Sequence, residues 1–266
     1  MLALICGQGA LPTRIVKNCY MRPLIVSLTQ FQPDELVPDI NFRLETLGTL
    51  LDLLNQREVT TVCFAGGIRR PDINSTLIDE FTQPLAASIS EAMAKGDDGA
   101  LRVMIEIFEQ AGFDVIGADD IVPDLLPPVG VLTKRLPTLQ DHTDATRGHA
   151  IIAGVSNLDV GQACAIANGQ VLAMEAYGGT DWMLNSLTER VGSWPLGGVL
   201  FKAPKIAQDR RFDLPCIGPE TCQKVKEAGL SGIVIAHAGV LVLDVADVIA
   251  EADRLDLFIW VCEAPL

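Results

Sequence analysis

The chain has 266 residues, of which 49% are hydrophobic and 20% charged, and its formal net charge is −14. These proportions exclude a disordered chain and fit one large domain or two small ones. The acidic balance argues against nucleic-acid binding, because an acidic surface repels a phosphate backbone, so an anionic ligand needs a local cluster of Lys and Arg or a bound metal.

The first half of the chain alternates predicted strands with predicted helices. In chain order they are strand Leu2–Cys6, helix Thr13–Tyr20, strand Leu24–Leu28, helix Phe42–Gln56, strand Thr61–Ala65, a helical stretch over 84–111 interrupted near Gly96, and a short strand over Phe113–Gly117. The order of strand and helix predicts parallel strands joined by right-handed crossovers, in a Rossmann-like open sheet.

Residues 123–137 contain four prolines and a glycine, which is typical of a connection between domains. We therefore expect an α/β protein of two domains. The N-terminal, Rossmann-like domain would span residues 1–130, and a C-terminal catalytic α/β domain would span residues 131–266.

The second half has a different pattern. Ala163–Ala176 reads as a hairpin, because Asn168-Gly169 between apolar runs is a strong turn signal. The remaining predicted elements are helix Asp181–Val191, strand Gly198–Phe201, helix Pro219–Gly229, strands Gly232–Ala236 and Val240–Leu243, helix Val245–Leu255 and strand Leu257–Val261. They predict a mixed sheet covered by helices.

The sequence also predicts the cellular compartment of the protein. Apolar runs fall short of the roughly 18–20 residues that span a bilayer, and the N-terminus lacks the basic region of a signal peptide. The seven cysteines are scattered without metal-binding spacing. We therefore expect a cytoplasmic protein with reduced thiols.

Two glycine-rich turns of the first half are candidates for ligand contact. Gly7 and Gly9 lie between a strand and a helix, where backbone N–H groups can approach a phosphate. The alternative is a plain tight turn, since Pro12 breaks the dinucleotide fingerprint. Arg69 and Arg70 follow another strand and could bind phosphate bidentately, or could simply be solvated.

Two acidic segments are also candidates. Asp98 belongs to a Lys-Gly-Asp-Asp sequence that could instead be a helix N-cap. Glu175 ends a predicted strand, and Gly179, Thr180 and Asp181 open the next helix. The latter group could line an anion or metal site, or could only cap that helix.

The densest polar segment spans residues 201–215. Its charged and amide side chains are Lys202, Lys205, Gln208, Asp209, Arg210, Arg211 and Asp213. In a chain of net charge −14, this basic loop is a local exception. Its cations suit a pyrophosphate, and its aspartates supply the hard oxygen ligands that Mg²⁺ prefers.

This loop, KAPKIAQDRRFDLPCIG, resembles the K-x-P-K-P-x-Q-x-x-R-x-D-x-P-x-I-G signature of the LpxI family. The similarity covers nearly the whole chain. LALICGQGALP, FAGGIRRPD, AKGDDGALR and LDVGQACAIANGQVLAMEAYGGTDWML resemble further family motifs in the same order. Members of the family are UDP-2,3-diacylglucosamine pyrophosphatases of lipid A biosynthesis in Gram-negative bacteria.

The resemblance implies two domains that clamp a lipid-linked UDP-sugar substrate in a cleft between them. It implies hydrolysis to UMP and 2,3-diacylglucosamine 1-phosphate (lipid X), with Mg²⁺ or Mn²⁺ as cofactor. Water would attack the phosphorus nearer the sugar. The essential Asp of the family corresponds to Asp213. The chain departs from the family at Gly178, where a Glu is frequent, and we expect Gly178→Glu to be tolerated.

These considerations assign roles to individual residues. The predicted catalytic residues are Asp213, Lys202 and Arg211, and the predicted metal ligands are Asp213 and Glu175. The predicted substrate-binding residues are Gly7, Gly9, Arg69, Arg70, Asp98, Gly179, Thr180, Asp181, Lys205, Gln208 and Arg210.

Two other functions are compatible with parts of the sequence. One is a non-catalytic sugar-nucleotide-binding protein of the same fold, and the other is an NAD(P)-dependent oxidoreductase built on the N-terminal strand–helix pattern. A lipid-linked substrate leaves room for peripheral contact with the inner face of the inner membrane. Homodimerisation is also left open.

Overall fold

The computed structural model describes the chain except residues 70, 95–96, 207, 213 and 264–266, and it leaves the side chains of residues 97–98 undescribed. The chain divides into two compact units. The N-terminal unit comprises Met1–Pro123 together with Asp209–Asp213, and the C-terminal unit comprises Asp124–Gln208 and Leu214–Leu266. The predicted continuous domain over residues 131–266 did not anticipate the return of Asp209–Asp213 to the N-terminal unit.

The N-terminal unit is built on a five-stranded sheet in the order β3-β2-β1-β4-β5. All neighbouring pairs are parallel, which confirms the predicted parallel sheet. The strands are β1 (Leu2–Cys6), β2 (Leu24–Leu28), β3 (Ile40–Phe42), β4 (Thr61–Ala65) and β5 (Asp114–Ile116). The chain moves outward from β1 in one direction to β2 and β3, then crosses back to β4, so the strand order reverses between β1 and β4.

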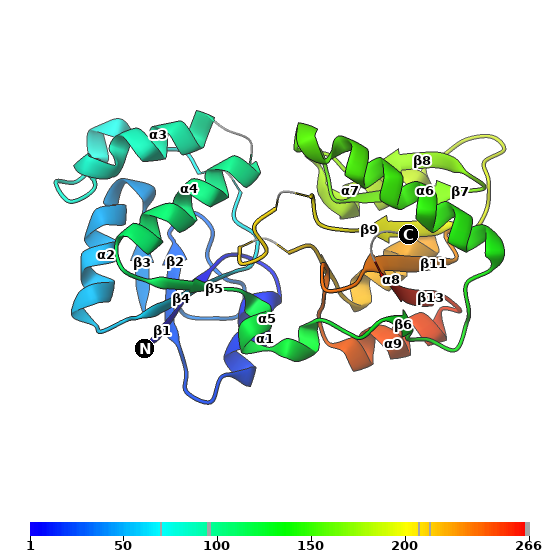
Figure 1. Cartoon of the computed structure of the whole chain (residues 1–266), viewed down its shortest axis with the longest axis horizontal. Coiled ribbons are helices and arrows are strands. Elements are labelled where there is room, and N and C mark those ends of the chain that lie inside the picture. The colour runs from blue at the N-terminus through cyan, green and yellow to red at the C-terminus, as the bar shows by residue number, and fades with distance from the viewer. Residues whose placement is uncertain (70, 95–96, 207, 213, 264–266) are drawn as a thin grey trace. The chain divides into compact units, whose positions relative to one another are not determined.

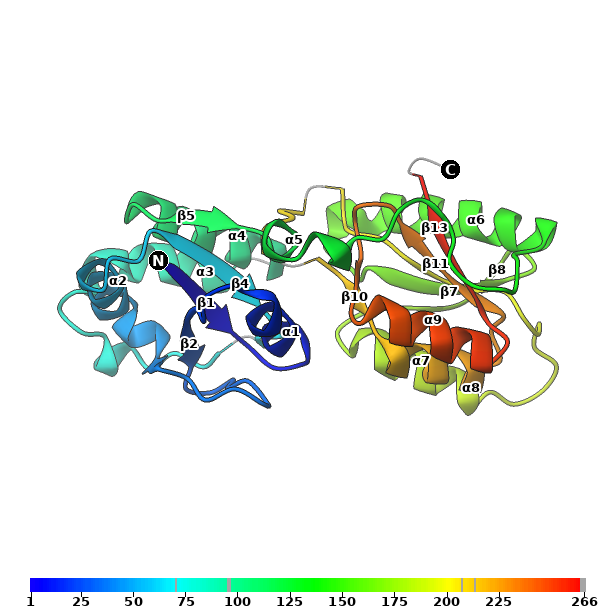
Figure 2. The same cartoon turned by 90° about the horizontal axis from the view of Figure 1, so that it is seen from below.

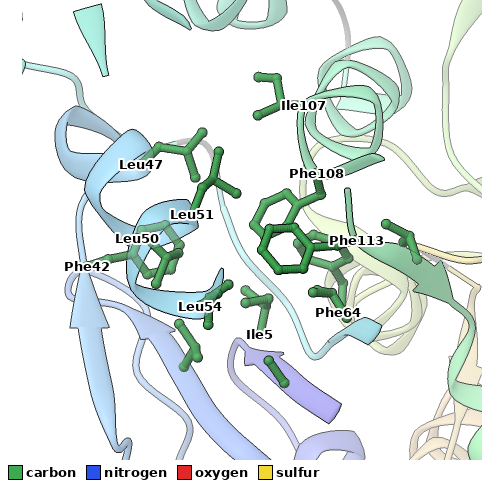
Figure 3. Close-up of a cluster of buried hydrophobic side chains, with 14 of the residues drawn as sticks. Ile5, Phe42, Leu47, Leu50, Leu51, Leu54, Phe64, Ile107, Phe108 and Phe113 are labelled. Atoms are coloured by element: carbon green, nitrogen blue, oxygen red, sulfur yellow. The ribbon is translucent and has the colours of Figure 1, made fainter. Parts of the chain in front are cut away.

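Helices cover both faces of this sheet (Figure 1). They are α1 (Leu11–Asn18), α2 (Leu47–Gln56), α3 (Ala86–Ala94), α4 (Asp97–Gln110) and α5 (Ala118–Ile121). Because right-handed crossovers in opposite directions place their helices on opposite faces, α1 lies across the sheet from α4. Alternate strand residues such as Ile5 and Phe64 join α2, α3 and α4 in one apolar cluster, which Figure 3 shows around Phe108.

The C-terminal unit contains a six-stranded sheet in the order β6-β13-β11-β9-β7-β8. The strands β9, β11 and β13 are parallel, whereas β6, β7 and β8 pair antiparallel, which confirms the predicted mixed sheet. These strands are β6 (Gly130–Val131), β7 (Ala163–Ala167), β8 (Gln170–Met174), β9 (Val199–Lys202), β11 (Gly232–Ala236) and β13 (Phe258–Cys262). A separate parallel pair joins β10 (Cys216–Ile217) to β12 (Leu241–Val242).

Helices lie on both sides of this sheet (Figure 2). One side carries α7 (Gly179–Thr188), α8 (Pro219–Glu227) and α9 (Val245–Arg254), and the other carries α6 (Leu139–Val155). Helix α6 was not predicted. It packs closely because Gly148 faces Phe201, where an added Cβ would lie 2.6 Å from the Phe201 Cβ.

Several predicted boundaries shift by a few residues. The predicted helix over 42–56 contains the end of β3, a short 3₁₀ turn and α2. The 3₁₀ turns of the chain are Leu44–Thr46, Ser75–Leu77, Gln83–Leu85, Pro123–Leu125 and Ser156–Leu158. None of the described helices combines the length and apolar character needed to cross a bilayer.

Candidate functional site

Lys202 is the last residue of the central strand β9, and it is a buried cation with only 7% of its surface exposed. Burial of a charge requires hydrogen-bond partners. Its ammonium donates to Thr180 Oγ1 at 2.8 Å and to the Cys216 carbonyl at 3.0 Å. The predicted catalytic Lys202 and the predicted binding residue Thr180 therefore lie together.

Glu175 extends this network on the other side of Thr180. The Thr180 hydroxyl donates to Glu175 Oε1 at 2.9 Å, and the Gln162 backbone N–H donates to Oε2 at 2.9 Å. Both carboxylate oxygens are thus held by protein donors. The result is a continuous chain of hydrogen bonds from Glu175 through Thr180 to Lys202.

An open cavity of about 260 Å³ adjoins this network in the C-terminal unit. It is lined by Lys202, by the first turn of α7 around Gly178 and Gly179, and by Thr221 in the first turn of α8. The first turns of helices carry N–H groups without intrahelical partners and the positive end of the helix dipole. Two such turns beside a buried ammonium make the cavity suited to an anion such as a phosphoryl group.

Asp181 also lines the cavity, but its carboxylate is paired with the Lys224 ammonium at 2.5 Å. The pairing neutralises a charge that would otherwise repel an anion. Sequence reasoning did not single out Lys224, because no pattern in its polar helix distinguishes this lysine from its neighbours.

Lys205 belongs to the same polar loop and is held by a different carboxylate. Its ammonium forms an ion pair with Asp159 Oδ1, and only 11% of its side chain is exposed. Its backbone N–H donates to Gln208 Oε1 at 3.0 Å, so the predicted binding residues Lys205 and Gln208 are also brought together. Gln208 itself is buried.

Arg211 is engaged within the N-terminal unit. Its guanidinium donates to Asp209 Oδ1 at 3.0 Å and Oδ2 at 2.7 Å, and to Glu109 Oε1 at 2.6 Å. The hydrogen bonds from Arg211 hold the pKa of Asp209 below its usual range, and the two carboxylates raise the pKa of Arg211. A phosphate would have to compete with both carboxylates for this side chain.

Phe212 anchors the same short segment. Its ring stacks on Phe64 with ring centroids 4.1 Å apart, and it packs against the apolar cluster of the N-terminal unit. This packing explains why residues 209–213 belong to that unit. Arg210, in the same turn, is exposed.

The glycine turns after β1 and β4 meet where the strand order reverses. Gln8 and Gly67 exchange two backbone hydrogen bonds, of 2.9 and 2.8 Å. A Cβ at Gly7 would lie 2.4 Å from the Gly67 carbonyl oxygen, so Gly7 is required by this close approach. Gly9 has a positive φ of 94° and donates its N–H to Asp34 Oδ2 at 2.7 Å.

Three predicted site residues cannot be placed fully. Arg70 and Asp213 lie outside the described residues, and for Asp98 only the backbone, in α4, is described. Arg69 is exposed in the loop after β4.

Glu175, a predicted metal ligand, has both carboxylate oxygens engaged by protein donors in this arrangement. Its two oxygens accept hydrogen bonds from Gln162 and Thr180, and the Thr180 hydroxyl is itself bonded to the Lys202 ammonium. Within the described residues, no group of three or more His, Cys, Asp or Glu side chains is arranged to hold a metal.

Sequence reasoning missed Asp159 and Glu109, and it considered Asp209 as an oxygen ligand for Mg²⁺ and not as a partner of Arg211. Asp159 pairs with Lys205, and Glu109 and Asp209 hold Arg211. Asp159 lies in the LDVGQ motif, so the resemblance of this motif to the family could have indicated it as a functional residue. Glu109 is one of several acidic residues on α4, and its partner is 102 residues away in sequence, so no local pattern pointed to it.

A parallel-sheet unit and a mixed-sheet unit define a two-unit α/β protein, whose C-terminal unit carries a cavity suited to an anion at two helix N-termini. The comparisons narrow this class. The family model described as LpxI N-terminal domain matches residues 1–125, and the LpxI C-terminal domain matches residues 128–260. The chain therefore belongs to the LpxI family. A protein of Caulobacter vibrioides named UDP-2,3-diacylglucosamine pyrophosphatase LpxI is 35% identical over an alignment of 272 residue positions, and the alignment covers 97% of this chain and 96% of that protein.

Proposed function

We propose that this chain hydrolyses the pyrophosphate bond of UDP-2,3-diacylglucosamine, giving UMP and 2,3-diacylglucosamine 1-phosphate in lipid A biosynthesis. Membership of the LpxI family and the named activity of the Caulobacter relative support the substrate. The observation that carries the chemistry is the buried Lys202 ammonium at a cavity formed by the N-termini of α7 and α8. This cation lies outside the N-terminal sheet, on which the NAD(P)-dependent alternative depends, so it favours the hydrolase.

The Lys202 ammonium and backbone N–H groups of the first turn of α7 would bind oxygens of one phosphoryl group, with the Thr180 hydroxyl holding the ammonium. Cleavage of a pyrophosphate leaves additional negative charge on the departing phosphate. Donors that are already oriented stabilise this charge without reorganising, and they act more strongly where water is excluded. Lys202 is oriented by its bonds to Thr180 and Cys216, and its burial limits its contact with water.

Asp213 would orient the attacking water and take its proton, since a carboxylate is a suitable general base. This role follows from the family signature. Arg211 precedes Asp213 by two residues and is held by Asp209 and Glu109, so we propose that it fixes this segment. The divalent cation, Mg²⁺ or Mn²⁺, stays a prediction from the resemblance; when bound, it would neutralise charge on the pyrophosphate.

The carboxyl edge of the N-terminal sheet would contact the nucleotide. Ligands of open α/β sheets bind where the strand order reverses, and the turns carrying Gly7 and Gly9 lie there. Arg69, Arg70, Asp98 and Arg210 stay predicted substrate contacts. A lipid-linked substrate of a cytoplasmic enzyme implies peripheral contact with the inner membrane, and homodimerisation stays a prediction.

The test is release of UMP from UDP-2,3-diacylglucosamine by the purified full-length chain. We expect Lys202→Met to lower kcat/KM roughly 10- to 150-fold, because a charge-assisted hydrogen bond contributes about 1.5–3 kcal/mol. Lys226→Met, at an exposed position near the end of α8, is the matched control and should retain activity.

Asp213→Asn keeps the size of the side chain and removes its charge. We expect activity to fall by at least ~10³-fold while the circular dichroism spectrum stays unchanged. Failure of the wild-type chain to release UMP would leave a non-catalytic binding protein as the better description. Near-normal turnover by the Asn variant would remove the catalytic role of Asp213.

A further inference from the structure

Two lysines of the polar loop are each held by a carboxylate from outside that loop. Asp159 lies four residues before β7 and pairs with Lys205, and Glu175 lies directly after β8 and acts on Lys202 through Thr180. The two carboxylates thus come from the two ends of the same β7–β8 hairpin.

The direction of the bonds around Thr180 is determined by chemistry. A carboxylate without a proton can only accept hydrogen bonds, and an ammonium group can only donate them. The single hydroxyl proton of Thr180 therefore points to Glu175, which leaves its lone pairs to accept from Lys202. Because Glu175 accepts the hydroxyl proton, the Thr180 oxygen faces the Lys202 ammonium as an acceptor.

This arrangement fixes the direction of the remaining donor of Lys202. An ammonium has three N–H groups, and the described residues occupy two of them, at Thr180 and at the Cys216 carbonyl. Because Lys202 lines the cavity, the third N–H is left for a ligand there. A Lys side chain is otherwise long and flexible, so these two bonds supply its orientation.

The two ends of the hairpin are packed against each other. The Gln162 N–H donates to Glu175 Oε2, and a Cβ at Gly161 would lie 2.0 Å from the Glu175 carbonyl oxygen. Asp159, two residues before Gly161, has the uncommon φ of 55°, which turns the chain into this contact. The backbone segments that carry Asp159 and Glu175 are therefore in close contact with each other.

We propose that Asp159 and Glu175 are positioning residues, which hold the ammonium groups of Lys205 and Lys202 in place for the pyrophosphate, and that Glu175 is not a metal ligand. The proposal rests on the proposed function. It assigns both acidic residues to the orientation of cations, whereas a metal-ligand role would assign Glu175 to the binding of Mg²⁺ or Mn²⁺.

A double-mutant cycle on full-length protein tests the action of Glu175 through Thr180. Glu175→Gln and Thr180→Val should each lower kcat on the order of 10-fold, with a smaller effect on KM. The double variant should be no worse than the more impaired single variant, because both changes interrupt the same chain of bonds. Thr180→Ser keeps the hydroxyl and should recover most of the rate lost in Thr180→Val.

The metal dependence separates the two roles of Glu175. A positioning residue leaves the Mg²⁺ concentration for half-maximal activity unchanged in Glu175→Gln, whereas loss of a ligand raises it several-fold. Additive losses in the cycle, or a raised Mg²⁺ requirement, would overturn the proposal. For the second pair, Asp159→Asn should add nothing to the loss caused by Lys205→Met, and an additional loss would count against Asp159 acting through Lys205.

A binding measurement separates this proposal from the proposed function. Calorimetric titration with inorganic pyrophosphate, without added divalent metal, should give several-fold weaker binding to Thr180→Val and Asp159→Asn than to the wild type or Lys226→Met. Equal binding by all four proteins would refute the positioning role even if the wild type releases UMP. Absence of UMP release combined with weakened pyrophosphate binding would refute the proposed reaction and retain the positioning role.

Discussion

Beside the cavity, the Trp182 side chain occupies the space that a side chain at position 178 would need. A Cβ added at Gly178 would lie 2.9 Å from Cγ of the Trp182 indole, although the backbone φ of −72° suits any residue. The indole is 64% exposed and can move outward. The obstacle at Gly178 is therefore one side chain and not the backbone.

We expect Gly178→Glu to lower stability by less than the roughly 1–3 kcal/mol that overpacking costs in a buried core, because Gly178 and the indole are exposed, and to disturb the mouth of the cavity. The sequence alone predicted that this change would be tolerated, and the contact with Trp182 revises that expectation. Thermal unfolding and kcat/KM measure the effect. Trp182→Ala in the same chain should relieve it, and a Gly178→Glu variant as stable and active as the wild type would show that the indole yields without cost.

At this scale the sequence singled out Gly179 and Thr180 where a helix opens after a strand, and Lys202 in a separate polar segment. The structure brings the two segments together through the bond between Lys202 and Thr180. The partners of Arg211 and Lys205 that are distant in sequence could not be predicted. Each pairs with a carboxylate more than forty residues away in sequence, and acidic residues are too numerous in this chain for charge alone to select one.

The segment 209–213 is stabilised by an ion pair whose strength depends on pH. Arg211 depresses the pKa of Asp209 in the folded chain. A depressed carboxylate pKa contributes stability that is fully present above the unfolded pKa, about 3.9 for Asp, and that is lost as the pH falls through the folded pKa. Acid should therefore weaken the N-terminal unit through this pair.

We expect Asp209→Asn to lower the stability of the N-terminal unit at pH 7 and to flatten its loss of stability below about pH 4. Arg211→Met should do the same, and the two changes should not add. Urea unfolding followed by circular dichroism at several pH values measures this. All three tryptophans, Trp182, Trp194 and Trp260, lie in the C-terminal unit, so their fluorescence is an internal reference. An unchanged pH slope in both variants would contradict the expectation.

Among the elements, those with strong apolar runs were predicted and α6 was not. The buried face of α6 carries Ala145, Gly148 and Ile152 together with the buried Asp141 and Asp144, so it lacks a periodic row of large apolar residues. Asp144 is buried because it accepts the N–H groups of the β7–β8 turn. The Thr138-x-x-Asp141 capping box was the one local signal for this helix.

For the whole molecule, the proposed reaction offers two phosphorus atoms of the pyrophosphate that water can attack. Following the family resemblance, we expect hydrolysis in ¹⁸O-labelled water to place the label in the sugar 1-phosphate and none in UMP. Mass spectrometry of the two products after a single turnover measures this, with unlabelled water as the control. Label in UMP would mean that the other phosphorus is attacked.

The return of residues 209–213 to the N-terminal unit has a consequence for how the gene can be divided. A fragment that ends near residue 125 would lack Phe212 and Arg211, so the Phe64 ring and the Glu109 carboxylate would lose the partners that they have in the intact chain. Recombination near that point would join a Phe64 from one parent to a Phe212 from another. We therefore expect the N-terminal half to depend on the other half of the gene for these contacts, although two separate family models describe the halves.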